Sequence, residues 1–254
     1  MSLSLASLNL HCGLDHHGAP YSVAAAIAAL DTDVVVVQEN WRPDGAPSLA
    51  RQAAAECGYP AYAELDVISG RSLLELGVAP DAPRDRTGGW GLAIMSRIPW
   101  RGLSALSLGA ARGDVVGARR ALTADIPLGA DGMLRVVDVH LTHRLVHGPA
   151  QLRRLLAGLG DTGVPTVIAG DLNMCRPTVF LAGAYRPVVR GRTWPAYRPV
   201  AQIDHILAGP GVEARSLGVA EPTGSDHRAI RAALALEPAR DGRVREAVCA
   251  VQAG

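Results

Sequence analysis

The stretch Ile168-Ala-Gly-Asp171-Leu-Asn173-Met174 anchors the interpretation of the whole chain. A mostly apolar run, residues 164–169, ends in Gly170 and is followed by Asp171-x-Asn173. This pattern predicts a buried strand with two polar side chains at its exit. Because residues two apart on an extended backbone point the same way, a carboxylate and a carboxamide would face one spot. Such a pair suits attack of water on an anionic ester, although Asp and Asn are also ordinary turn residues.

The segments around this stretch alternate between strand-like and helix-like patterns. Residues 34–37 are four consecutive valines, which is typical of a strand buried on both faces. Ser48 can cap a helix that ends at Gly58. The predicted strands span residues 3–10, 34–37, 61–67, 90–96, 115–126, 133–141, 164–169, 202–207, 214–219 and 229–236, and the predicted helices span residues 21–30, 49–56 and 149–159. Residues 77–89 are rich in Pro, Asp, Arg and Gly and are predicted to form a long loop.

The order of these elements predicts an α/β fold with two sheets packed face to face and helices outside. The 254 residues suffice for one large domain with a sizeable core. We expect a single domain over residues 1–236 and a C-terminal tail over residues 237–254, which is either a short helix or disordered. The formal net charge of +1 gives no general polyanion signal, so nucleic acid is neither indicated nor excluded as a partner.

Membrane and export signals are not evident in the sequence. No run approaches the ~18–20 apolar residues that a membrane span needs. The first nine residues lack the basic and apolar regions of a signal peptide. The four cysteines are scattered without a CxxC pair, so a structural zinc site is not indicated. We therefore expect reduced thiols, a cytoplasmic location and a monomer.

Several predicted strands have a polar residue near one end that strand formation itself does not require. These residues are Asn9, Glu39, His140, the pair Asp171 and Asn173, the pair Asp204 and His205, and the run Ser225-Asp226-His227. A single Glu or His at a strand end is usually solvated or a cap. Six strand ends that all carry a potential metal ligand or acid/base group are improbable as independent coincidences. If the strands end at a common edge, these groups converge on one site.

This ordered set of motifs resembles the endonuclease/exonuclease/phosphatase family. The family comprises metal-dependent phosphoesterases such as pancreatic-type DNases, abasic-site endonucleases, neutral sphingomyelinases and inositol-polyphosphate phosphatases. The matching pieces are Ser7-Leu-Asn9, Val37-Gln-Glu39, Gly91-Leu-Ala-Ile-Met-Ser96, Val139-His-Leu141, Gly170-Asp-Leu-Asn173, Gln202-Ile-Asp-His-Ile206 and Gly224-Ser-Asp-His227. The resemblance implies a four-layered α/β sandwich, in which two mostly antiparallel sheets pack face to face with outer helices.

The resemblance also implies a metal site and a histidine–carboxylate dyad. Glu39 is the first-choice ligand for Mg²⁺ (or Mn²⁺), with Asn9 beside it and Asp226 as a further ligand, because hard oxygen donors suit these ions. His227, paired with Asp204, resembles the dyad of the family. The carboxylate would fix the tautomer of the ring and support its charged form.

Three further residues match catalytic positions of the family. Asp171 would orient or deprotonate the attacking water. Asn173 would donate to a phosphoryl oxygen in the transition state. His140 would bind the phosphate or protonate the leaving group. The resemblance leaves open which histidine acts as acid and which as base.

Other residues near the motifs have a functional and a structural interpretation. For His11, His16 and His17 a solvated loop is favoured, with a second metal site as the alternative. His143 could touch substrate, but a solvated loop is favoured for it as well. For His205, next to Asp204, a structural or rim role is favoured over catalysis. Arg112, Arg119 or Arg120 could clamp a phosphate, but a surface position is favoured in a chain this rich in arginine. For Trp90, Trp194 and Tyr197, packing is at least as well supported as stacking on a substrate.

The motif residues and the family resemblance together imply a Mg²⁺-dependent, nuclease-like phosphodiesterase with a phosphate ester, which could be nucleic acid, as its substrate. The alternative is a phosphomonoesterase that acts on a small-molecule or lipid head-group phosphate. A non-catalytic binding module is disfavoured because every key polar residue is present. The sequence has no basic stretch with interleaved aromatics, and no evident apolar anchor that would indicate a membrane substrate. Residues 77–89 and 188–199 are the expected specificity loops, since both are long and flank motif strands.

Overall fold

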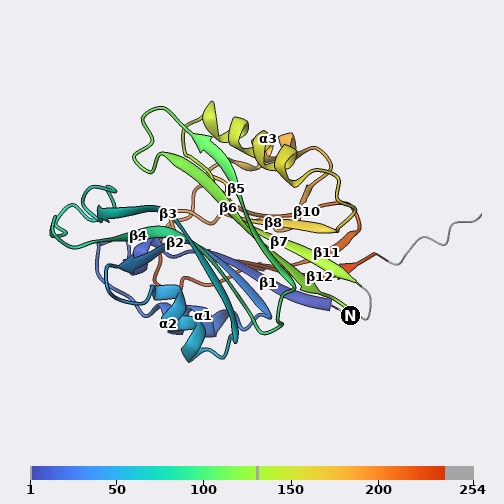
Figure 1. The fold of residues 1–254 in the computed structure, drawn as a ribbon, viewed down its shortest axis with the longest axis horizontal. Helices are drawn as coiled ribbons and strands as arrows, with labels where there is room; N and C mark the ends of the chain where they lie inside the picture. Colours follow the sequence, from blue (N-terminus) through green and yellow to red (C-terminus); the bar gives the residue numbers. More distant parts are fainter. Residues whose placement is uncertain (1, 130–131, 238–254) are drawn as a thin grey trace, which may run out of the picture.

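Two six-stranded sheets lie face to face in the computed structural model, which describes residues 2–129 and 132–237. Helices cover the outer face of each sheet, so the described chain has four layers (Figure 1). The fold predicted from the sequence is therefore confirmed. The single-domain boundary at residue 236 stays a prediction, and residues 238–254 of the predicted tail lie outside the described residues.

The first sheet has the strand order β11-β12-β1-β2-β4-β3. Its strands are β1 (Ser2–Asn9), β2 (Val34–Pro43), β3 (Ala61–Ser72), β4 (Thr87–Ser96), β11 (Val212–Val219) and β12 (Ile230–Leu236). Only the β1–β2 pair in this sheet is parallel. Helices α1 (Val23–Leu30) and α2 (Leu49–Glu56) pack on its outer face.

The second sheet has the order β5-β6-β7-β8-β10-β9. Its strands are β5 (Gly102–Ala110), β6 (Ala118–Pro127), β7 (Met133–His140), β8 (Thr166–Asp171), β9 (Arg186–Pro187) and β10 (Asp204–Ala208). Here only β7 and β8 run parallel. Helix α3 (His147–Leu159) covers its outer face, and two short helical turns, α4 (Arg176–Val179) and η2 (Phe180–Ala182), follow β8. A further turn, η1 (His11–Gly13), follows β1.

The alternation of side chains along each strand divides the apolar residues between two environments. On β2, Val34 and Val36 enter the core between the sheets, whereas Val35 and Val37 pack under α1 and α2. All four valines are fully buried. This explains why the strand is apolar without alternation: each of its faces covers a core.

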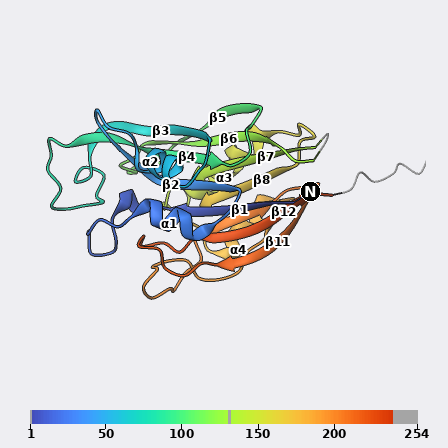
Figure 2. The same cartoon turned by 90° about the horizontal axis from the view of Figure 1, so that it is seen from below.

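The same alternation directs the polar strand ends into the space between the sheets. On β8, Val167 and Ala169 lie in the intersheet core, so Asp171 lies on the same face. On β10, Ile206 and Ala208 lie in that core, and Asp204 shares their face. The register pairs Asp171 with His140 on one side and with Asp204 on the other. The polar groups thus lie at one end of the intersheet core, at the opposite end of the sandwich from the N-terminus (Figure 2).

Several element boundaries differ from the sequence-based prediction. Strand β5 was not predicted, because it is an edge strand whose side chains are mostly exposed and therefore lack a clear apolar alternation. The predicted loop 77–89 is shorter, since β4 begins at Thr87. Strand β3 continues to Ser72 through two register shifts against β4. In the described residues, no helix is long and apolar enough to cross a membrane.

Candidate active site

A pocket of about 490 Å³ opens at this end of the sandwich. Six of the eight predicted site residues line it, namely Glu39, His140, Asp171, Asn173, Asp226 and His227. The other two, Asn9 and Asp204, are buried directly behind it and bond to residues of its wall. The structure therefore brings all eight residues into one neighbourhood, from segments that lie as far apart as residues 9 and 227.

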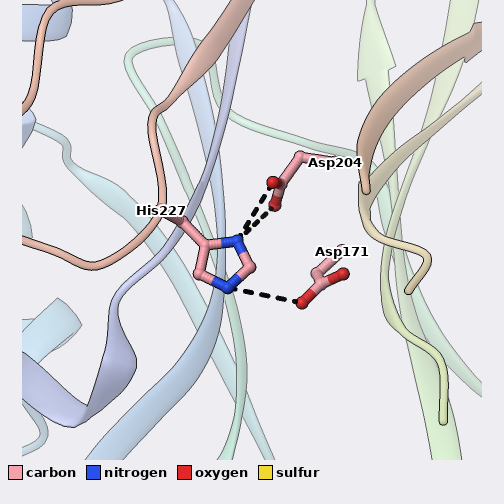
Figure 3. A group of neighbouring side chains, drawn as sticks. All are labelled: Asp171, Asp204 and His227. Carbon is pink, nitrogen blue, oxygen red and sulfur yellow. Dashed lines mark hydrogen bonds and ion pairs between the residues drawn. The ribbon is translucent and has the colours of Figure 1, made fainter. Parts of the chain in front are cut away.

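His227 and Asp204 form a buried hydrogen-bonded pair (Figure 3). The Nδ1 atom of His227 lies 3.1 and 3.0 Å from the two carboxylate oxygens of Asp204. Because a carboxylate only accepts, Nδ1 carries the proton and Nε2 faces the pocket. Burial alone would lower the pKa of His227, but the charge and hydrogen bonds of Asp204 outweigh it and raise the pKa to about 10.

Asp171 lies at the centre of the polar cluster. Its Oδ2 atom accepts a hydrogen bond from Asn9 Nδ2 at 3.1 Å and lies 3.4 Å from His140 Nε2 and 3.9 Å from His227 Nε2. Its Oδ1 atom accepts from the backbone N–H of Asn173 at 2.8 Å. Burial and the neighbouring charge of Asp204 raise the pKa of Asp171, and His227 opposes this shift. A carboxylate with a raised pKa is a better proton acceptor at neutral pH.

The GDxN stretch is both a turn and part of the pocket. Strand β8 ends at Asp171, and Asn173 has a positive φ of 52°, so the two residues do not share extended backbone as predicted. Their convergence arises instead from the turn that the Asp171 side chain closes onto the Asn173 backbone. Gly170 is required here, because a Cβ atom at this position would overlap the carbonyl oxygen of Val139.

His140 and Asn173 are joined directly. Asn173 Nδ2 lies 3.0 Å from His140 Nε2 and donates a second hydrogen bond to the carbonyl oxygen of Leu141, also at 3.0 Å. Burial, Arg119 and His227 lower the pKa of His140, which favours its neutral form. His140 and His227 are therefore electrostatically different: His227 favours the charged form and His140 the neutral one.

Glu39 reaches the pocket because of a bulge in β2. By alternation from Val35 and Val37 it would point toward the helices, but its φ is 52° and the register against β4 shifts between Val37 and Asn40. A bulge of this kind re-aims a side chain. Asn9 Nδ2 donates to Glu39 Oε1 at 3.1 Å, which fixes the carboxylate beside Asp171.

The donor set fits a hard divalent cation. Glu39, Asp171 and Asp226 line the pocket and Asp204 lies behind it, which gives four carboxylates in one small volume. Oδ1 of Asp226 is buried and has no hydrogen-bond partner. One ligand atom from each of Asp171, Asp204 and His227 lies within 4.8 Å of the others, a spacing that could also hold a metal ion (Figure 3). Carboxylate oxygens of this kind are the donors that Mg²⁺ and Mn²⁺ prefer.

Asn9 is oriented differently from a simple metal ligand. Its amide nitrogen contacts Glu39 and Asp171, and its oxygen accepts from the backbone N–H of His11 at 2.9 Å. Ser225 adds a second tie, because its hydroxyl donates to the carbonyl oxygen of Asn9 and accepts from the backbone N–H of His227. Asn9 and Ser225 thus hold the ends of β1 and of the segment before β12 together.

Arg119 is a pocket residue that the sequence analysis favoured as a surface residue. It is 3% exposed and lines the pocket beside Trp90 and His140. Its Nε and Nη2 atoms donate to the two carboxylate oxygens of Asp114 at 3.0 and 3.2 Å, while Nη1 is buried without a partner. A buried guanidinium with a free N–H is a ready donor for a phosphate oxygen. The sequence signal was only an Arg-Arg pair before a strand.

Other residues near the motifs divide between pocket and core. His11, His143, Trp90 and Trp194 line the pocket, although the first two were expected in solvated loops. His205 is fully buried on the opposite face of β10, and its Nε2 lies 2.8 Å from the carbonyl oxygen of Met174, which fits the structural role expected for it. Both predicted specificity loops reach the pocket. Gly77 and Val78 begin the loop 77–89 and line the pocket together with the preceding Leu76, and Trp194 lines it from residues 188–199.

The chain resembles known proteins over most of its length. A family model described as "Endonuclease/Exonuclease/phosphatase family" matches residues 6–227. A search of curated proteins finds no match. Among solved structures, an endonuclease/exonuclease/phosphatase family protein from Bacteroides thetaiotaomicron is 15% identical, with a TM-score of 0.72, and the match covers 94% of this chain and 99% of that one.

Two further solved structures have functional names. A D. rerio TDP2 complexed with a single-strand DNA product is 17% identical, has a TM-score of 0.62 and is covered to 98%, with 92% of this chain covered. The mannosyl-6-phosphatase Bt3783 of Bacteroides thetaiotaomicron is 14% identical, has a TM-score of 0.63 and is covered to 100%, again with 92% of this chain covered. At these identities the structures establish the fold alone. Together with the family match and the site geometry, they show that the chain belongs to the endonuclease/exonuclease/phosphatase family of phosphoesterases.

Proposed function

We propose that this phosphoesterase is a Mg²⁺- or Mn²⁺-dependent phosphodiesterase with a nuclease-like arrangement of catalytic groups. The observation that carries the proposal is the pairing of Asp204 with His227 beside a second carboxylate, Asp171, whose pKa is raised. A base and a charged imidazole that face one pocket provide both proton transfers that ester hydrolysis needs. Glu39 and Asp226, with Asn9 supporting Glu39, are the proposed metal-binding residues.

The metal ion would neutralise charge on the phosphate and lower the pKa of a bound water. The chain's own residues are proposed to do the rest. Asp171 orients the attacking water and takes its proton. His227, which Asp204 holds in its charged form, presents Nε2 to the phosphate or the leaving oxygen.

Arg119 and Asn173 complete the proposed phosphate site. The free Nη1 of Arg119 donates to a non-bridging oxygen. Both Asn173 Nδ2 contacts go to protein atoms, so its predicted donation to a phosphoryl oxygen requires the substrate to replace His140 or Leu141 as acceptor. The pocket then surrounds one phosphate with donors before any part of the leaving group is bound.

The second candidate is a phosphomonoesterase, which the fold match to a mannosyl-6-phosphatase supports. Hydrolysis of bis-p-nitrophenyl phosphate and of p-nitrophenyl phosphate separates the two, each measured with Mg²⁺, with Mn²⁺ and with EDTA. Metal-dependent turnover of the diester supports the first proposal, and turnover of the monoester alone replaces it with the second. If neither ester is hydrolysed with either metal, both proposals fail. If one of the esters is hydrolysed, a panel of plasmid DNA, abasic DNA, RNA, phosphoinositides and sphingomyelin identifies the natural leaving group. Cytoplasmic location and a monomeric state remain predictions.

A further inference from the structure

Three of the segments that line the pocket carry exposed apolar side chains, and each contributes a side chain to its wall. Residues 110–117 contribute Val115, residues 141–147 contribute His143, and residues 188–202 contribute Trp194. The first two segments are tied together, because Arg144 Nη2 donates to the carbonyl oxygen of Gly113 at 2.5 Å. In Figure 1 the turn from β5 to β6 and the start of α3 lie at the same end of the second sheet. His11 and residues 76–78 also line the pocket. The three segments therefore form one part of its outer rim, which is called the mouth rim below.

The mouth rim exposes large apolar side chains. Leu145 and Val146 are 90% and 80% exposed, and Val115 is 61% exposed. Tyr197, Val200 and Trp194 are also exposed on the third segment. These six make up most of the large apolar side chains that are exposed in the described residues. The sequence shows no evident apolar anchor, and the exposure of these side chains becomes apparent only in the folded chain. Such a concentration near one pocket is typical of an interaction surface.

The charges of the mouth rim are all of one sign. Its exposed arginines are Arg112, Arg144, Arg190, Arg192 and Arg198. The only carboxylate in the three segments is Asp114, which is buried and paired with Arg119. Exposed arginines next to exposed aliphatic and aromatic side chains are suited to an anionic surface that also has an apolar interior.

We propose that the mouth rim docks the protein on an anionic lipid surface. Leu145, Val146 and Val115 would enter the boundary between head groups and acyl chains, where burial of apolar area favours binding. The arginines would contact lipid phosphates, and Tyr197 would lie at the head-group level, which aromatic rings with a polar edge prefer. Aliphatic tips favour this partner over single-stranded nucleic acid, because bases stack on aromatic faces and gain little from Leu or Val.

The inference concerns attachment and does not depend on the proposed reaction. Binding can be measured by co-sedimentation of the full chain with vesicles in EDTA, where no metal-dependent turnover occurs. One set of vesicles contains phosphatidylcholine alone, and the other contains equal parts of phosphatidylcholine and phosphatidylglycerol. The test variant is the double substitution L145E/V146E. Neither residue lines the pocket or belongs to the proposed catalytic machinery.

The matched control is Leu103→Glu, which places the same charge on an exposed apolar residue of β5 at the other end of the sandwich. We expect the wild type and the control to bind the anionic vesicles much more strongly than the neutral ones. The double variant should lose at least tenfold in partitioning, while its turnover of a small soluble ester matches that of the wild type.

The inference is overturned if the wild type does not bind anionic vesicles, or if the double variant and the control bind equally well. A single-stranded oligonucleotide provides the competing outcome. If the wild type binds it and not the vesicles, and L145E/V146E weakens that binding, the mouth rim is a nucleic-acid surface instead.

Discussion

His227 and Asp204 face each other with the imidazole Nδ1 3.1 and 3.0 Å from the two carboxylate oxygens, and both side chains are almost completely buried. The two residues come from different sheets: Asp204 begins β10 and His227 precedes β12. The pair therefore forms only when the sandwich closes, and it links the position of the imidazole to the packing of the sheets.

Asp204→Asn and His227→Ala should not be additive, because the two residues act as one unit. Each substitution is expected to lower kcat for the preferred ester roughly 10²-fold or more, and the double variant should lose little beyond the more severe single variant. The measurement is a double-mutant cycle on kcat, with circular dichroism as a check on folding. Losses that multiply in the double variant would show that Asp204 acts independently of His227.

Substitution of Glu39 or Asp226 should weaken binding of a divalent cation. We expect Glu39→Gln and Asp226→Asn to raise the Kd for Mn²⁺ about tenfold or more, since each replaces a negatively charged carboxylate of the site by a neutral amide. Water-proton relaxation of Mn²⁺ measures this without turnover. Glu213→Gln, an exposed carboxylate on β11, is the matched control and should bind Mn²⁺ like the wild type. Equal binding by all of these variants would place the ion elsewhere.

Arg119→Lys should lower kcat/KM by about 10–100-fold while the fold is retained. Lysine keeps the charge near Asp114 but cannot bond two carboxylate oxygens and still point a third N–H at a phosphate. Alanine is less informative, because an unpaired buried Asp114 would cost ~3–5 kcal/mol of stability. Arg120→Lys is the control, since Arg120 is only half-buried and does not line the pocket. Similar kinetics for both variants would remove Arg119 from the phosphate site.

Asp138 should make stability depend on pH. It is fully buried on β7, accepts a hydrogen bond from Gln38 Nε2 at 2.6 Å through Oδ1, and has no partner at Oδ2. Burial raises the pKa of Asp138 well above its ordinary value. The folded state then binds the proton more tightly than the unfolded state, so stability is complete below the unfolded pKa of ~3.9 and falls as pH rises through the folded pKa.

Asp138→Asn removes this ionisation and keeps an oxygen for Gln38. The variant should be more stable than the wild type at pH 8, by a margin that shrinks toward pH 5 with a slope of at most ~1.4 kcal/mol per pH unit. Urea unfolding of both proteins at a series of pH values measures the margin, and ionisations elsewhere cancel in the difference. A margin that does not change with pH would mean that Asp138 stays in one protonation state.

Gly170→Ala should be far more damaging than alanine at another glycine with positive φ. A Cβ atom at residue 170 would overlap the Val139 carbonyl, whereas Gly163 has φ +68° and no atom within 4 Å of the position that a Cβ would take. We expect Gly163→Ala to cost about 1 kcal/mol and Gly170→Ala more than about 3 kcal/mol of unfolding free energy, measured with urea. Comparable losses would show that the GDxN turn tolerates a wider approach to β7.

Local sequence patterns predicted the elements that depend on near neighbours. The four valines of β2, the cap at Ser48 and the apolar run into Gly170 each follow from contacts within a few residues and from the two-residue period of a strand. The edge strand β5 was missed because most of its side chains are exposed, which weakens that period. The order of the motifs along the chain indicated the family and its sandwich fold, which no single segment could indicate.

The eight predicted site residues that gather at the pocket could be named from the sequence and the family resemblance, because each stands at or near a strand end where the fold needs no polar group: Asn9, Glu39, His140, Asp171, Asn173, Asp204, Asp226 and His227. How these side chains face one another follows from the folded chain. The bulge at Glu39, the turn at Asn173 and the unpartnered Nη1 of Arg119 depend on contacts between strands far apart in the chain. The same holds for the mouth rim, since exposure of Leu145 and Val146 is a property of the packed surface and not of their sequence neighbours.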